Sequence, residues 1–109
     1  MPLRRGDSLN ARRKIEEARQ ELDRLTIDLV RLVARRDEIV LRIGKFKAEQ
    51  GLQVDDPERE AQVLEAGRKA SVEMGVDPNV IEAVLKLLIA HGRKLQREAL
   101  SGRGASHPC

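Results

Sequence analysis

Apolar side chains recur at alternating intervals of three and four residues through the first half of the chain, the spacing of one helix face. Asp7 or Ser8 can cap the start, and Gly51 is the expected stop, because the pattern continues in phase past Gly44. The pattern predicts one helix of roughly 40 residues, which needs partners along its whole span. We call this face the apolar seam, and it consists of Ile15, Ala18, Leu22, Leu25, Leu29, Leu32, Ile39, Ile43 and Phe46.

Two shorter helices are predicted after it, over residues 57–73 and 78–100. Asp56 and Asp77 each stand directly ahead of a proline, so the carboxylate can cap the first turn and the proline can take the first helical position. Gly75 is a C-terminal signal between the two helices. The sequence has no alternation typical of strands and no internal repeat. The fold class is therefore all-α, with one long helix and two shorter ones per chain.

The composition suits one helical domain, or a subunit that completes its core by association. The chain has 109 residues, of which 40% are hydrophobic and 36% charged. We expect a flexible N-terminus over 1–7, the helical domain over 8–100 and a flexible tail over 101–109. The single cysteine, Cys109, excludes an internal disulfide and favours a reducing compartment. No secretory signal or membrane span is found, so the expected location is cytoplasmic.

One position breaks the apolar seam, because Arg36 stands where the spacing asks for leucine. A guanidinium removed from water needs an anionic partner, either a carboxylate of the protein or a bound anion. Lys47 projects from nearly the same face about three turns later, roughly 16 Å along the axis. Arg19 lies roughly 25 Å before Arg36, so it can reach the same ligand only from a second copy of the chain.

The charge balance bears on which anion this would be. The net charge is +3, from 21 basic and 18 acidic residues. This mild excess fits attraction to small anions better than binding to nucleic acid, which usually needs a concentrated basic patch.

The third helix offers a neutral donor beside a glycine. Gly92 and Gln96 are four residues apart and share a helix face. Glycine in the middle of a helix costs about 1 kcal/mol against alanine, so Gly92 indicates close approach by another group. Gln96 can donate a hydrogen bond without titrating. His91 is expected to be structural or partly exposed.

Three segments at their mutual spacing resemble the all-helical (type II) chorismate mutase family. They read "ARQELDRLTIDLVRLVARRDEIVLRIGKFK", "VDDPERE" and a third helix with Gln96, and the resemblance runs from about Arg19 to Gln96. It implies an intertwined homodimeric helical bundle, in which the long first helices pair and each of two sites takes one arginine from the other subunit. It also implies the Claisen rearrangement of chorismate to prephenate, in phenylalanine and tyrosine biosynthesis.

The resemblance also assigns roles to the cations and to the glutamine. Arg19 is the arginine donated across subunits, and Arg19 and Arg36 would hold the two substrate carboxylates. Lys47 and Gln96 would donate to the ether oxygen, where negative charge grows as the C–O bond breaks.

Four further positions complete the site that the resemblance implies. Asp56 and Glu60 would engage the ring hydroxyl or the positively polarised side of the ring, with Glu60 counted among the catalytic residues. Arg59 would orient those carboxylates or contact the substrate. Gly92 departs from the family, which often has serine there, so one hydroxyl contact to a substrate carboxylate is missing. A backbone group, a water or Arg93 is left to compensate.

A pericyclic reaction requires no nucleophile, metal or redox cofactor, so the resemblance implies no cofactor and no metal site. Two alternatives share the architecture: an isochorismate pyruvate-lyase and a 4-amino-4-deoxychorismate mutase. A non-catalytic helical dimerisation module is the alternative of another class. The expected partners are chorismate and a second copy of the chain, with neither nucleic acid nor membrane. Association with another aromatic-pathway enzyme stays open.

Overall fold

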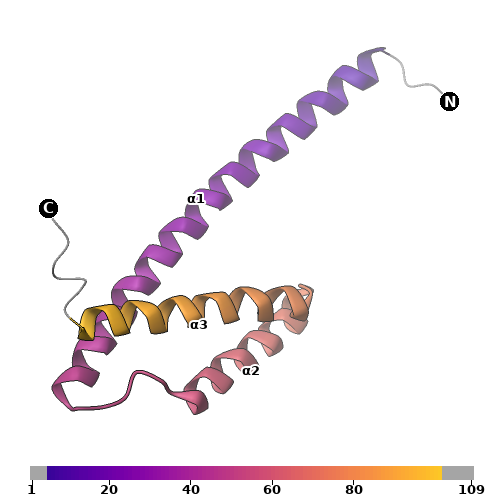
Figure 1. The fold of residues 1–109 in the computed structure, drawn as a ribbon. Coiled ribbons are helices and arrows are strands. Elements are labelled where there is room, and N and C mark those ends of the chain that lie inside the picture. Colours follow the sequence, from indigo (N-terminus) through magenta and orange to yellow (C-terminus); the bar gives the residue numbers. More distant parts are fainter. Residues whose placement is uncertain (1–4, 102–109) are drawn as a thin grey trace, which may run out of the picture. The chain divides into compact units, whose positions relative to one another are not determined.

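The computed structural model describes residues 5–101, and all regular structure in that part of the chain is helical (Figure 1). Helix α1 spans Arg5–Glu49, α2 spans Pro57–Met74 and α3 spans Pro78–Leu100. The predicted order of one long helix and two shorter ones is confirmed. Of the predicted flexible ends, residues 1–4 and 102–109 lie outside the described part.

The predicted start of the first helix is wrong. Asp7 and Ser8 lie inside α1, which already begins at Arg5. No proline follows Pro2 in this region, so nothing in the covalent structure forces the helix to begin later.

The starts of α2 and α3 follow the sequence signals. The Asp56 carboxylate accepts from the Arg59 backbone N–H at 3.1 Å, and the Asp77 carboxylate accepts from the Asn79 backbone N–H at 2.9 Å. Each aspartate satisfies a backbone donor that has no partner within its helix, and a proline follows each. Both predicted caps are confirmed.

The ends of α1 and α2 use glycine in the left-handed conformation. Gly51 has φ +66° and Gly75 has φ +71°. Beyond each glycine the next backbone N–H reaches back across the last turn, from Leu52 to the Lys47 carbonyl at 2.8 Å and from Val76 to the Ser71 carbonyl at 2.9 Å. This pattern closes a helix end with little strain, and it confirms both predicted stops.

The chain divides into two compact units, Met1–Arg36 and Asp37–Cys109. In the second unit α2 and α3 pack against each other as a helical hairpin (Figure 1). Gly67 brings the helices close, because a Cβ there would collide with Leu85 Cδ1. The buried Ser71 hydroxyl donates to the Gly67 carbonyl at 2.6 Å, and Ile89 is the one large apolar side chain that the described residues bury. This hairpin alone makes only a small core.

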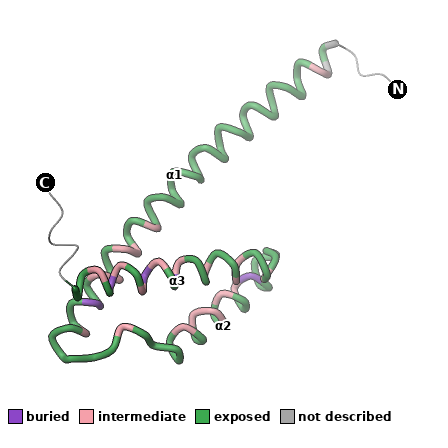
Figure 2. The backbone as a smooth tube through the Cα atoms, in the orientation of Figure 1, coloured by how far each residue is buried: buried purple, intermediate pink, exposed green. Residues whose placement is uncertain are grey.

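The apolar seam is uncovered in the single chain, and Figure 2 shows most of α1 as exposed. Leu22 is 61% exposed and Leu32 is 68% exposed. Burying such side chains is worth about 1.5–3 kcal/mol each, so the seam leaves a large driving force for association unused. No helix among residues 5–101 combines the length and the apolar character that crossing a bilayer requires.

A different face of α1 meets α3 within the second unit. Gly44 is buried and Val40 and Lys47 are half-buried, whereas Ile43 and Phe46, one residue earlier in each case, are exposed. The last turns of α1 therefore carry two neighbouring faces: one packs inside the unit and the other continues the uncovered apolar seam.

We expect the effect of Gly67→Ala on the free energy of unfolding to depend on Leu85, because these two residues meet where α2 and α3 approach each other. In the wild-type background the added methyl group should cost about 1 kcal/mol or more, because it overpacks the contact. In a Leu85→Ala background the same change should stabilise by up to about 1 kcal/mol, since only the helix preference of alanine remains. Chemical denaturation at one protein concentration measures both effects. Equal effects in the two backgrounds would show that Leu85 does not limit the space.

Candidate functional site

The side chain of Gln96 on α3 is anchored to the backbone of α1. Gln96 is 6% exposed, and its Nε2 donates to the Val40 carbonyl oxygen at 2.9 Å. Gly44 lies one turn beyond Val40, and a Cβ there would come within 3.0 Å of Gln96 Cγ. Glycine thus opens the notch that lets the glutamine approach. The bond uses one of two N–H groups of the amide and fixes the plane in which the other is held.

Lys47 reaches from the end of α1 to the loop that precedes α2. Its Nζ donates to the Val54 carbonyl oxygen at 2.9 Å, and the residue is half-buried. An ammonium group has three N–H donors, so this bond leaves two of them for other acceptors. The contact places a positive charge at the junction of α1 and the loop.

The first turn of α2 carries Asp56, Arg59 and Glu60. Asp56 caps the helix and is exposed, and the exposed Arg59 donates from Nη1 to Gln62 Oε1 at 3.4 Å. Glu60 is half-buried, and its Oε2 lies 3.6 Å from Nε of Arg93 on α3. Arg93 is therefore engaged with a predicted site residue, next to the buried Gly92.

A second polar contact joins α1 to α3 beside Gly92. Nε2 of His91 lies 3.2 Å from both carboxylate oxygens of Asp37, with hydrogen-bond geometry toward Oδ2. Oδ1 of Asp37 is buried and has no hydrogen-bond partner. The structural role expected for His91 is consistent with this contact.

Six of the eight predicted site residues belong to the unit Asp37–Cys109. Three contacts join the elements that carry them: Gln96 on α3 to Val40 on α1, Lys47 on α1 to Val54 in the loop before α2, and Glu60 on α2 to Arg93 on α3. The six are Lys47, Asp56, Arg59, Glu60, Gly92 and Gln96.

The other two predicted residues belong to the unit Met1–Arg36. There Arg19 is exposed on α1, and Arg36 is half-buried.

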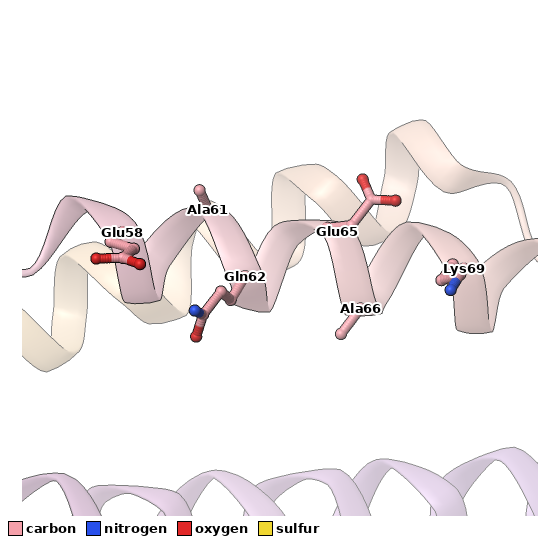
Figure 3. Close-up of a pocket in the computed structure, with 6 residues that line it drawn as sticks. All are labelled: Glu58, Ala61, Gln62, Glu65, Ala66 and Lys69. Atoms are coloured by element: carbon pink, nitrogen blue, oxygen red, sulfur yellow. The ribbon is translucent and has the colours of Figure 1, made fainter.

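Two open hollows are found among the described residues, and none of the eight predicted residues lines either of them. One follows the exposed face of α2, where its lining side chains line up along that single helix (Figure 3). The other follows α1 between Asp23 and Arg31. Among residues 5–101, no three His, Cys, Asp or Glu side chains gather as metal ligands would. The α2 hollow is lined by Glu58, Ala61, Gln62, Glu65, Ala66 and Lys69.

Sequence reasoning missed the contacts that hold the predicted residues in place. Arg97 Nη2 lies 2.6 Å from Asp55 Oδ1, which fastens the loop to α3. Arg93 and Arg97 are four residues apart, and this spacing is a sequence signal that they share one face of α3. The sequence does not identify the Val54 carbonyl as the acceptor for Lys47, because every residue of the loop has a carbonyl oxygen.

Comparison with known proteins gives a consistent result. Residues 18–97 match the family model described as chorismate mutase type II. A chorismate mutase of Methanocaldococcus jannaschii is 30% identical over 87 residues, which cover 80% of this chain and 88% of that protein. The T-protein of Haemophilus influenzae is 38% identical over 72 residues, 66% of this chain and 19% of that protein. A 4-amino-4-deoxychorismate mutase of Streptomyces pristinaespiralis is 28% identical over 94 residues, 86% of this chain and 73% of that protein.

We expect the Asp37–His91 contact to stabilise the fold by about 1 kcal/mol, the usual net value of a hydrogen bond. Asp37→Ala and His91→Ala should each lower the free energy of unfolding, and the double variant should lose about 1 kcal/mol less than the sum. Asp28→Ala is the control, because its pair with Arg31 is exposed and lies within one helical turn. Additive losses in the double variant would mean that the two side chains do not interact.

Proposed function

The chain belongs to the type II chorismate mutase family, and from that premise we propose that it works as an intertwined homodimer with two equivalent sites. It is an enzyme that rearranges chorismate to prephenate. The extent of the family match carries this conclusion, because residues 18–97 contain all eight predicted site positions, from Arg19 to Gln96. We assign the reaction to phenylalanine and tyrosine biosynthesis in the cytoplasm, a reducing compartment that suits a lone cysteine.

The uncovered apolar seam supports the dimer. Leu22, Leu25 and Leu32 are each more than half exposed, and a second α1 helix with the same seam would cover them. Arg19 supports the same arrangement, since roughly 25 Å of helix separates it from Arg36 in its own chain. Each site would then combine Arg19 of one protomer with the remaining residues of its partner.

In this proposal Arg19 and Arg36 bind the two carboxylates of chorismate. A guanidinium offers a planar pair of N–H groups that matches a carboxylate, so each arginine fixes orientation as well as charge. Holding both carboxylates keeps the enolpyruvyl side chain folded over the ring. The entropy cost of that compact conformer is met on binding, before the reaction begins.

Lys47 and Gln96 act on the bond that breaks. The ether C–O bond of chorismate breaks while a C–C bond forms within the same molecule, and no proton moves. Negative charge accumulates on the ether oxygen in the transition state, where the ammonium and the amide donate hydrogen bonds to it. Both donors are held by backbone carbonyls, at 2.9 Å in each case, which supports their fixed placement.

Glu60, Asp56 and Arg59 serve the ring side of the substrate. Glu60 is half-buried beside Arg93, so its carboxylate is held ready to accept from the ring hydroxyl. Asp56 caps α2 through one oxygen and can present the other oxygen to the substrate. Arg59 orients these carboxylates or contacts the substrate directly.

Gly92 bears on whether the substrate is chorismate or a close analogue of it. Without a serine hydroxyl at this position one contact to a carboxylate is missing, and similarity to a 4-amino-4-deoxychorismate mutase favours that substrate as the second candidate. A bifunctional chorismate mutase/prephenate dehydratase of Aquifex aeolicus is 35% identical over 52 residues, 14% of that protein, which supports a link to another enzyme of the pathway.

The decisive experiment is incubation with chorismate, with its 4-amino analogue and with isochorismate, followed by identification of the products. Prephenate from chorismate is the expected result. Release of pyruvate from isochorismate alone would identify a lyase, and reaction of the amino analogue alone would identify the second candidate. Thermal denaturation with an oxabicyclic transition-state analogue is an independent check, since a ligand at one hundred times its Kd stabilises the native state by about 2.7 kcal/mol.

We expect Lys47→Ala and Gln96→Ala each to lower kcat by about 100-fold or more, as loss of one donor to a developing oxyanion usually does. Arg36→Ala should raise KM as well, because it removes a group that binds the ground state. Steady-state kinetics of the purified variants measure the split between kcat and KM. A normal kcat in Lys47→Ala would remove the lysine from its proposed role.

Mixed dimers test whether Arg19 crosses between protomers. Arg19→Ala and Arg36→Ala proteins should each be nearly inactive, and unfolding and refolding them together should restore about a quarter of wild-type activity. Half of the dimers are then mixed, and each has one intact site of two. A mixture of Arg36→Ala and Lys47→Ala is the matched control, since both residues come from the same protomer and every site keeps a defect. Equal activity in the two mixtures would contradict donation across subunits.

A further inference from the structure

The ion pair between Asp55 and Arg97 joins the loop before α2 to the last turns of α3. Nη2 of Arg97 lies 2.6 Å from Oδ1 of Asp55, a distance typical of a strong charge-assisted hydrogen bond. The two side chains are 59% and 49% exposed. A pair that is this exposed contributes little to the free energy of unfolding, so its importance depends on what it holds in place.

Each residue of the ion pair directly follows a residue that takes part in an anchoring hydrogen bond. Val54 precedes Asp55, and its carbonyl oxygen accepts from Lys47 Nζ at 2.9 Å. Gln96 precedes Arg97, and its amide donates to the Val40 carbonyl oxygen at 2.9 Å. The ion pair is therefore one residue away from each of the two anchoring hydrogen bonds.

Together these contacts form a closed ring within the unit Asp37–Cys109. The ring runs along α1 from Val40 to Lys47, crosses to the loop at Val54, crosses to α3 through Asp55 and Arg97, and returns from Gln96 to Val40. Each crossing is a polar contact of 2.6–2.9 Å. If the ion pair is removed, the loop that carries the Val54 carbonyl loses its tie to α3, and the anchor for Lys47 can shift. Gln96 keeps its own bond to α1.

We propose that the Asp55–Arg97 ion pair is a positioning element that fixes the Lys47 ammonium relative to the Gln96 amide. This inference rests on the proposed function, in which these two groups donate to the ether oxygen of the breaking bond. In this proposal neither Asp55 nor Arg97 is assigned a contact with the substrate. They act through the Val54 carbonyl, which holds the end of a flexible four-carbon side chain in one place.

The effect should appear in kcat rather than in KM. In the proposed function Arg19 and Arg36 bind the substrate carboxylates, and neither arginine is part of the ring of contacts. The lysine stabilises charge that develops only in the transition state, so its displacement raises the barrier without weakening ground-state binding. We expect Arg97→Gln and Asp55→Asn each to lower kcat about tenfold and to change KM less than about twofold.

The same kinetics on three further proteins test whether the pair itself is responsible. The double variant Asp55→Asn/Arg97→Gln should be no slower than either single variant, because the ring is already open. The reversed pair Asp55→Arg/Arg97→Asp should recover most of the lost kcat. Lys94→Gln removes the same positive charge from an exposed position on α3, and it should leave kcat unchanged.

The outcomes separate this inference from the proposed function. A low kcat in Lys47→Ala together with a wild-type kcat in Arg97→Gln would overturn the positioning role alone. An equal loss in Lys94→Gln would also overturn it, since net charge would then explain the effect. A wild-type kcat in Lys47→Ala would overturn the proposed donor role and the positioning role with it. Thermal denaturation of each variant identifies any loss that comes from unfolding.

Discussion

An apolar face that its own chain leaves uncovered is the constraint on which the rest of this protein depends. The apolar seam of α1 carries leucines that are 58–68% exposed, from Leu22 to Leu32. The described part of a single chain buries one large apolar side chain, Ile89, and so offers little core of its own. In the proposed dimer, folding would be inseparable from association, and the surface that stabilises the chain would also bring Arg19 to its site.

The last turns of α1 show how one helix serves two purposes. Ile39, Ile43 and Phe46 continue the apolar seam, while the neighbouring face presents a notch at Gly44 to α3. These two faces are about 100° apart because successive residues of an α-helix differ by that rotation. A polar contact can thus be built inside the unit without interrupting the seam. Gln96 uses this contact, since its approach to the Val40 carbonyl depends on the missing side chain at Gly44.

The helices could be predicted from the sequence because their signals are local. Asp56 and Asp77 cap through backbone groups two or three residues away, and Gly51 and Gly75 act through their own backbone angles. The start of α1 could not be predicted in the same way, because the helix begins at Arg5, ahead of Asp7 and Ser8, whose side chains were expected to cap it.

The resemblance predicts which residues form the candidate site, but it does not predict the contacts that hold them in place. Lys47 and Gln96 are predicted as donors, whereas their own acceptors in the fold are backbone carbonyls, which no residue type reveals. Forty-two residues separate Asp55 from Arg97, and only the fold brings them together.

The different burial of Gln96 and Lys47 explains why one proposed donor is neutral and the other is charged. Gln96 occupies the buried position, where a charged side chain would lose its hydration at a cost of several kcal/mol. A neutral amide with one N–H bonded to the Val40 carbonyl loses less. Lys47 supplies the charge from a half-buried position, where solvent and the Val54 carbonyl keep the ammonium group satisfied before substrate arrives. In this proposal the buried amide of Gln96 fixes the direction of one hydrogen bond to the ether oxygen, and the partly solvated ammonium of Lys47 supplies the positive charge beside that oxygen. For a rearrangement that moves electrons and no protons, this combination would stabilise the ether oxygen through hydrogen bonds and charge alone.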